Sequence, residues 1–138
     1  MESLEAAADI CVDTDILVDY LRKRDPGSTA YKKWKSKAKL SITSVSVFEL
    51  LLGVHLSSRK NERMAEVESL LEHHAILPFD RGAATVAAQV GSGLRSEGAG
   101  IEIRDLFNGA ICSSRTIPIL TRNLTHYARI PKLSVISS

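Results

Sequence analysis

Four acidic side chains hold positions where they could do chemistry: Asp13, Asp15, Glu49 and Asp105. The first two directly follow a short apolar run at positions 10–12, and Glu49 is the only formally charged side chain between positions 44 and 56. Removing an isolated carboxylate from water is costly unless it is paired, protonated or bound to a cation. We therefore expect Glu49 to have a partner. The alternative is that it lies on an exposed stripe of its helix with Ser46 and Gly53.

A cluster of carboxylates favours a hard divalent cation, because the like charges repel one another and a cation offsets them. Mg²⁺ and Mn²⁺ suit oxygen ligands, and Mg²⁺ keeps several waters that a substrate can replace. Such a cation can activate a water molecule against a phosphodiester without any protein nucleophile. The sequence contains no convincing Ser/His/Asp or Cys/His arrangement, so it predicts metal-dependent phosphodiester hydrolysis.

Further polar residues stand near these acids or follow another apolar run, but each also has an ordinary structural interpretation. Thr121, Arg122 and Asn123 follow the run at 117–120, and Asn108 lies one helical turn after Asp105. Asp105 alone is a plausible helix N-cap, and Asn123 a plausible turn residue. Arg122 can contact phosphate or pair with an acid. Asp19, four residues after Asp15, can simply pair with Lys23.

The elements that would position these side chains alternate along the chain. Short apolar runs predict strands at 10–12, 40–43, 75–79, 117–121 and 133–136. Helical patterns cover 16–23, the region of Tyr31 to Ala38, 45–56, 62–73, 81–95 and 105–114, with Asp15 and Ser44 as expected N-caps. This alternation predicts an α/β fold with a parallel five-stranded sheet, at whose carboxyl edge ligands bind.

The composition is that of one globular domain. The chain has 138 residues, 44% hydrophobic and 25% charged, which excludes a disordered or low-complexity protein. No apolar run is long enough to span a membrane, and the first ten residues lack Lys and Arg, so we expect a cytoplasmic protein with positions 1–9 as a loose extension. Cys11 and Cys112 match no zinc spacing and are expected to be reduced core residues.

The net charge of +2 hides an uneven distribution. Positions 22–39 hold eight basic residues against one acid, a balance of +7, so the rest of the chain carries −5. This basic segment indicates either a polyanionic partner or a solvated helix face. Tyr31 and Trp34 lie within it at helical spacing, which favours core packing over stacking on bases.

Four short motifs, in this order, resemble those of PIN-domain nucleases: residues 12–17, residues 48–53, Arg104-Asp105-Leu106 with Ala110, and residues 120–123. The chain is most similar to the VapC-type toxins of toxin–antitoxin pairs, and the resemblance extends from Ile10 to Val135. It implies a single PIN-like domain over 1–138 and an endoribonuclease that uses Mg²⁺ or Mn²⁺. It also implies a small antitoxin as partner and a homodimer, for which the helices at 45–56 and 81–95 offer surfaces.

The resemblance also assigns roles to residues. Asp13, Glu49 and Asp105 would be the principal catalytic and metal-binding acids, with Asn123 in a fourth position where other members carry Asp. Asp15 and Asn123 are possible further ligands, and the supporting residues would be Thr14, Asp15, Thr121 and Asn108. The RNA-binding candidates are Arg22, Lys23, Arg24, Lys32, Lys33, Lys35 and Arg122. His126 is expected at the surface or in packing, with the cleft as the alternative.

Two other interpretations remain open at this point. The chain could be a PIN fold that binds RNA or a partner with weak or no catalysis, since Asn123 carries no charge. Asp13-Thr14-Asp15 after a buried strand also resembles the DxD motif of haloacid-dehalogenase-like phosphatases, in which the first Asp is a nucleophile. A late Asp-Asp pair, expected of such phosphatases, is missing from the sequence.

Overall fold

The computed structural model describes residues 8–98 and 100–138. Its five strands are β1 (Asp9–Val12), β2 (Lys39–Thr43), β3 (Ala75–Leu77), β4 (Ile119–Thr121) and β5 (Val135–Ser137). They form one sheet in the order β3-β2-β1-β4-β5, and every neighbouring pair is parallel. The predicted five-stranded parallel sheet is therefore confirmed, and all strand carboxyl ends meet at one edge.

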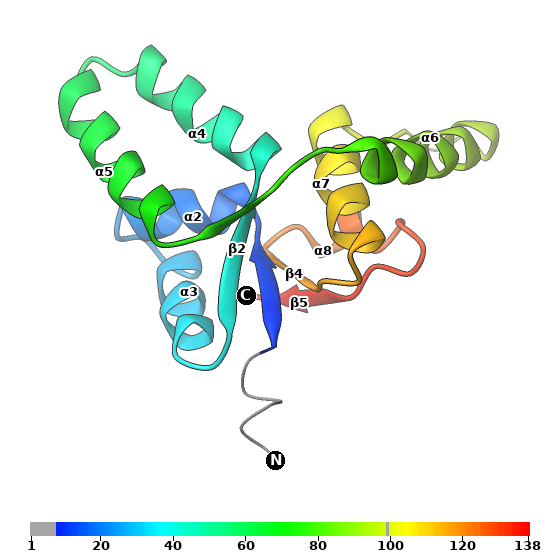
Figure 1. Cartoon of the computed structure of the whole chain (residues 1–138), viewed down its shortest axis with the longest axis horizontal. Coiled ribbons are helices and arrows are strands. Elements are labelled where there is room, and N and C mark those ends of the chain that lie inside the picture. Colours follow the sequence, from blue (N-terminus) through cyan, green and yellow to red (C-terminus); the bar gives the residue numbers. More distant parts are fainter. Residues whose placement is uncertain (1–7, 99) are drawn as a thin grey trace.

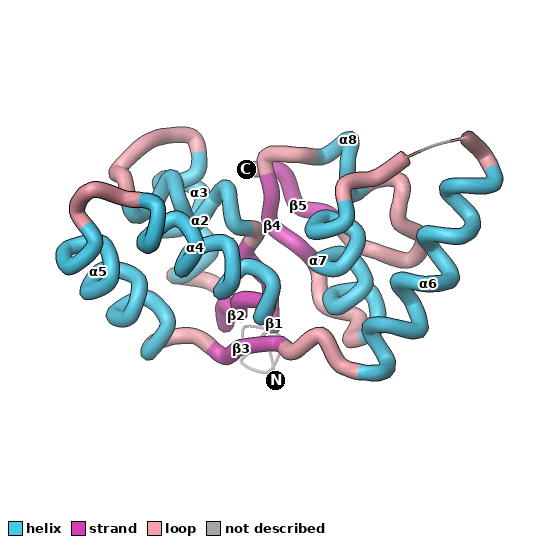
Figure 2. The backbone as a smooth tube through the Cα atoms, turned by 90° about the horizontal axis from the view of Figure 1, so that it is seen from above, coloured by secondary structure: helices cyan, strands magenta, loops and turns pink. Residues whose placement is uncertain are grey.

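Helices cover the sheet on both sides, as Figures 1 and 2 show. One group comprises α2 (Thr14–Leu21), α3 (Gly27–Lys35), α4 (Ser44–Leu56) and α5 (Lys60–Glu72). The other comprises α6 (Arg81–Ser96), α7 (Ile103–Ser114) and the single-turn α8 (Leu124–Tyr127). The predicted helix positions are confirmed, with ends that differ from the expected ones by a few residues.

Two faces of the sheet give two cores, because successive side chains of a strand point to opposite faces. In β1, Ile10 and Val12 pack into the core under α2 to α5, whereas Cys11 packs with Cys112 and Ile119 on the other side. Both cysteines are buried and free, as expected. Because β1 is covered on both faces, the residue that follows Val12 emerges in a protected position at the carboxyl edge.

The two expected N-caps, and the alternative cap role of Asp105, are wrong by one to three residues. Asp13, not Asp15, caps α2, and Thr43, not Ser44, caps α4. The strands β1 and β2 run into α2 and α4 without a loop, so the extended residue at each junction caps the helix. Helix α7 starts at Ile103 with Glu102 as its cap, which places Asp105 in the first turn and frees its side chain from capping.

The expected loose extension at 1–9 is too long. Asp9 belongs to β1 and pairs with Lys39, and the Ala8 carbonyl accepts the Lys39 amide at 3.0 Å. Positions 1–7 lie outside the described residues. In the described part of the chain, no helix combines the length and the hydropathy that crossing a bilayer requires.

Gly27 is expected to tolerate no side chain. A Cβ on Gly27 would overlap Cβ of Asp19, and the Gly27 amide donates to the buried Asp19 Oδ2 at 3.0 Å. Gly27→Ala should lower the free energy of unfolding by about 1–3 kcal/mol in urea denaturation. Gly93→Ala is the matched control, since Gly93 lies inside α6 with nothing within 4 Å of its Cβ position. It should raise stability by about 0.5–1 kcal/mol, and equal losses in both variants would contradict this explanation.

Candidate active site

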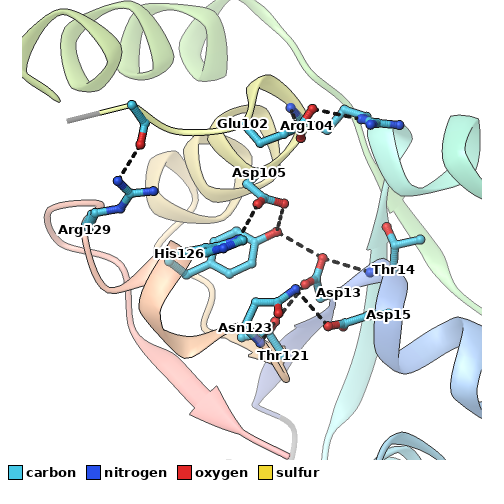
Figure 3. Close-up of polar contacts among 12 residues, drawn as sticks. Asp13, Thr14, Asp15, Glu102, Arg104, Asp105, Thr121, Asn123, His126 and Arg129 are labelled. Atoms are coloured by element: carbon cyan, nitrogen blue, oxygen red, sulfur yellow. Dashed lines mark hydrogen bonds and ion pairs between the residues drawn. The ribbon is translucent and has the colours of Figure 1, made fainter. Parts of the chain in front are cut away.

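Asp13 lies at the centre of the carboxyl edge, between the end of β1 and the start of α2, and only 4% of it is exposed. Its Oδ1 accepts the Thr14 amide at 2.9 Å and the Tyr127 hydroxyl at 3.0 Å. Its Oδ2 accepts the Thr121 hydroxyl at 2.7 Å. Figure 3 shows these contacts. The three donors fix the orientation of the carboxylate from three separate segments.

The environment of Asp13 disfavours its charge. Burial raises the pKa of Asp13 to about 7, with a further contribution from the nearby Asp15, against the opposing effect of its three hydrogen bonds. A buried carboxylate with this pKa is ready to ionise once positive charge arrives. Perturbed carboxylates of this kind are typical of functional sites.

Asp105 reaches the same place from α7. Its Oδ1 lies 3.3 Å from the Tyr127 hydroxyl, and its Oδ2 lies 2.9 Å from Nδ1 of His126 (Figure 3). The Tyr127 hydroxyl thus lies between Asp13 and Asp105. The His126 side chain is 49% exposed, so the expected surface position is confirmed, and its contact with Asp105 means that it also reaches the acidic site.

Glu49 borders this pair from α4. Its Oε1 accepts the Thr14 hydroxyl at 2.6 Å, and its Oε2 lies 3.6 Å from Nη1 of Arg104. Ser46, one turn earlier, is buried and contacts the same Thr14 hydroxyl at 2.7 Å. The alternative of an exposed stripe shared with Ser46 is therefore wrong, and Glu49 has partners as its apolar helix predicts.

A fourth acidic side chain, Asp15, faces the end of β4. The Asn123 amide donates to its Oδ2 at 3.1 Å, and Nε of Arg122 lies 3.5 Å from the same oxygen. Burial raises the pKa of Asp15, and Arg122 opposes that shift. Arg122 also lies 3.6 Å from Asp19, whose other cationic neighbour is Arg24 at 3.9 Å rather than the expected Lys23.

Asn108 supports the site through a contact with Thr43. It is 1% exposed, and its Oδ1 accepts the Thr43 hydroxyl at 2.5 Å. The same hydroxyl oxygen caps α4 through the Ser46 amide at 3.0 Å. Asn108 therefore ties α7 to the start of α4, which aligns the helices that carry Asp105 and Glu49.

The donor set fits a divalent cation that keeps several of its waters. Among residues 8–98 and 100–138, no three Asp, Glu, His or Cys side chains are arranged to hold an ion by themselves. Mg²⁺ commonly binds through one or two carboxylates and completes its shell with water. Asp13 and Asp105 offer such a pair, and within the described part of the chain Oδ1 of Asp15 is buried without a hydrogen-bond partner.

Most of the basic candidates lie elsewhere. Arg22, Lys23 and Arg24 follow α2, and Lys32, Lys33 and Lys35 are exposed on α3. Helix α3 leads into the amino end of β2, opposite the edge that carries the acids (Figure 1). Of the candidates, only Arg122 contacts the site acids. Tyr31 is buried and Trp34 half-buried, so the expected core packing is confirmed.

Sequence reasoning missed two residues at this site. Arg104 pairs with both Glu49 and Glu102, the latter at 3.3 Å, and Tyr127 joins the two central acids. The sequence offered a hint of the position of Arg104, because this residue immediately precedes Asp105. Tyr127 lies one helical turn after Asn123, a spacing that would have placed it on the same face.

Comparison with known proteins agrees with these observations. The sequence profile of the PIN domain matches residues 10–133. Ribonuclease VapC of Rickettsia bellii is 29% identical over 131 residues, which are 93% of this chain and 95% of that protein. The tRNA(fMet)-specific endonuclease VapC of Shigella flexneri is 26% identical over 119 residues, 86% of this chain and 89% of that protein.

Solved structures show the same fold. A VapBC2 structure from Rickettsia felis, bound to a promoter DNA fragment, matches with a TM-score of 0.85 at 20% identity, covering 94% of this chain and 98% of that one. A DNA-bound VapBC structure from Salmonella typhimurium matches with a TM-score of 0.83 at 22% identity and the same coverage. The expected resemblance to VapC is confirmed, and it replaces the phosphatase interpretation. The chain belongs to the PIN domain family.

Proposed function

We propose that this chain is a VapC-type endoribonuclease that hydrolyses RNA phosphodiester bonds at the acidic site with Mg²⁺ or Mn²⁺. The observation that carries the proposal is that Asp13 and Asp105, which are far apart in the sequence, contact one hydroxyl group. The relatives named ribonuclease or tRNA(fMet)-specific endonuclease support RNA as the substrate class. The donor chemistry described above supports the cation.

The acidic residues and Asn123 would supply the oxygen ligands of the cation. Asp13 and Asp105 would hold the cation, with Asp15, Glu49 and Asn123 as the neighbouring oxygen donors. A bound divalent cation activates a water molecule for attack on phosphorus and offsets the charge that develops on the phosphate.

The surrounding side chains orient these donors and meet the substrate. Thr121 orients Asp13, and Thr14 orients Glu49. Arg104 and Arg122, each held by two acids, are positioned to meet the RNA backbone on either side of the acidic site.

A small antitoxin partner is part of this proposal. On α4, the side chains of Phe48, Leu52 and Leu56 recur at four-residue spacing and are 54%, 39% and 78% exposed. Beside them lies a groove of about 550 Å³ between α2, α4 and α5, and Glu49 is among its lining residues. A protein segment in this groove would reach the acidic site. The VapBC assemblies among the structural neighbours support such a partner.

The homodimer and the cytoplasmic location also belong to the proposal. A shallow depression of about 540 Å³ on α6 is lined by the small residues Ala87, Ala88, Gly91, Ser92 and Ser96 and by Arg95. The same helix packs on α7, where Ala87 is buried in one cluster with Leu106 and Ala110. A second copy of the chain could approach this part of α6 closely, because small side chains allow it.

The alternative is a PIN fold that binds RNA without cutting it. Two observations favour it: Asn123 brings no charge, and Glu49 already pairs with Arg104. Incubation of the purified chain with RNA and Mg²⁺ or Mn²⁺ separates the two functions. Our proposal predicts cleavage that stops with EDTA and returns when the cation is restored. Binding without cleavage under all these conditions would support the alternative, and cleavage that persists in EDTA would exclude the mechanism.

The basic segment provides a separate prediction about RNA affinity. Changing Lys32, Lys33 and Lys35 together to Ser should weaken RNA binding and reduce its dependence on salt, because fewer counterions are released. Filter binding at several salt concentrations measures both quantities. Lys60→Ser, at the start of α5, is a single-charge control. If the triple variant keeps the wild-type affinity and salt slope, the segment is only a solvated face.

A further inference from the structure

The hydroxyl of Tyr127 contacts two carboxyl groups and has one hydrogen to donate. It lies 3.0 Å from Oδ1 of Asp13 and 3.3 Å from Oδ1 of Asp105. The side chain is fully buried, so water does not compete for this hydrogen. The shorter contact favours Asp13, and Asp105 shares the same donor while it is held on its other oxygen by His126.

The position of this hydroxyl is fixed by the core, not by a surface loop. The Tyr127 ring belongs to the cluster that contains Cys11, Cys112, Ile119 and Ile130. Cys11 lies on β1, two residues before Asp13. Cys112 lies on α7, the helix that carries Asp105. The cluster that holds the Tyr127 ring thus includes residues of β1, which ends directly before Asp13, and of α7, which carries Asp105.

Two ionised carboxylates that contact one hydroxyl group repel each other, and the shared hydrogen-bond donor offsets part of this repulsion. A cation site needs its ligands close together before the cation binds. If they must be brought together on binding, the affinity for the cation is lower. Hydrogen bonds to the ligands from the surrounding residues generally supply this preorganisation and tune metal affinity.

We propose that Tyr127 is a positioning residue that sets the spacing and orientation of Asp13 and Asp105 for the divalent cation. This inference rests on the proposed function, since it assumes that these two acids bind the cation. Tyr127 acts through the carboxylates and touches neither RNA nor the reacting atoms.

The chain offers a matched control in Tyr31. That side chain is 1% exposed and its hydroxyl is also hydrogen-bonded, to Nε2 of His74 at 2.9 Å. It packs in the other core, under α2 to α5, and makes no contact with the acids. Tyr31→Phe therefore removes a buried, bonded hydroxyl without changing the site.

The test is a calorimetric titration of the purified variants with MnCl₂. Tyr127→Phe should weaken Mn²⁺ binding by about tenfold, and Tyr31→Phe should change it by less than about twofold. Thermal unfolding in EDTA reports the stability lost in each variant. Unchanged Mn²⁺ affinity in Tyr127→Phe, or an equal loss in both variants, would overturn the assignment.

Asp13→Asn separates this inference from the proposed function. If Asp13→Asn abolishes Mn²⁺ binding but Tyr127→Phe does not weaken it, only the role of Tyr127 is wrong. If Asp13→Asn also binds Mn²⁺ as the wild type does, the metal centre itself is wrong.

A measurement on the wild-type protein avoids dependence on the folding of Tyr127→Phe. The chain has three tyrosines, so labelling with 3-fluorotyrosine gives three ¹⁹F resonances, which Tyr20→Phe and Tyr31→Phe variants assign. The Tyr127 resonance should shift during titration with Mg²⁺, while that of Tyr31 should not. A Tyr127 resonance that stays constant through saturation would contradict the inference.

Discussion

Asp13→Asn is expected to lower RNA cleavage by at least about 100-fold, since loss of a residue that merely supports a metal ligand already costs about 10- to 100-fold. Asparagine has nearly the same shape as aspartate but no charge to offer a cation. The three groups that contact Asp13 can keep a hydrogen bond to Asn. The Thr121 hydroxyl then accepts from the new amide instead of donating to the carboxylate. Initial rates with Mg²⁺ and with Mn²⁺ measure the effect.

Asp25→Asn is the control for this substitution. Asp25 is exposed after α2, and its side chain bonds only the amide and hydroxyl of Thr29 among the described residues. The control should cleave RNA at the wild-type rate. An Asp13→Asn variant with wild-type activity would show that the acid at the centre of this site does not take part in catalysis.

The metal-free protein is expected to lose stability as the pH rises from about 4 to about 7, through the ionisation of Asp13. Its pKa is about 7 in the folded protein against an ordinary value of 3.8, and burial is the main cause. Between these values the folded state holds a proton that the unfolded state has released. Stability therefore falls with rising pH, by up to about 1.4 kcal/mol per pH unit.

Other carboxylates oppose this trend, because the pKa values of Asp80, Glu62 and Asp25 are lowered by their own hydrogen bonds. The informative quantity is thus the difference between wild type and Asp13→Asn in urea unfolding with EDTA. Relative to wild type, the variant should gain stability from pH 4 to pH 7 and keep that gain at pH 8. A pH-independent difference would mean that Asp13 is already ionised in the metal-free protein.

The fold was predictable from the sequence because its strands are short apolar runs that alternate with helical patterns. The same alternation places polar residues at strand ends, and Asp13 and Thr121 meet there as the topology requires. Glu49 was predictable for a different reason: a single charge in an apolar helix needs a partner, and Thr14 and Arg104 provide it.

The rest depends on tertiary geometry that local patterns do not contain. The caps of α2 and α4 differ from the expected ones because these two helices follow β1 and β2 without a loop, and residue propensities do not report the length of a junction. In the sequence, Tyr127 has the pattern of a core aromatic residue, and its ring does lie in the core. That its hydroxyl reaches two acids becomes evident only in the structure. The location of the basic segment depends on the direction of α3 in the fold. The number of charges in the sequence does not predict that direction.

Crystals of the protein soaked in MnCl₂ test the central claim most directly, because anomalous scattering locates the ion without reference to activity. We expect one strong peak whose nearest protein atoms are carboxylate oxygens of Asp13 and Asp105, and no such peak in crystals of Asp13→Asn. A wild-type crystal with Mn²⁺ bound only elsewhere, or with no anomalous peak at this edge of the sheet at saturating Mn²⁺, would contradict the account.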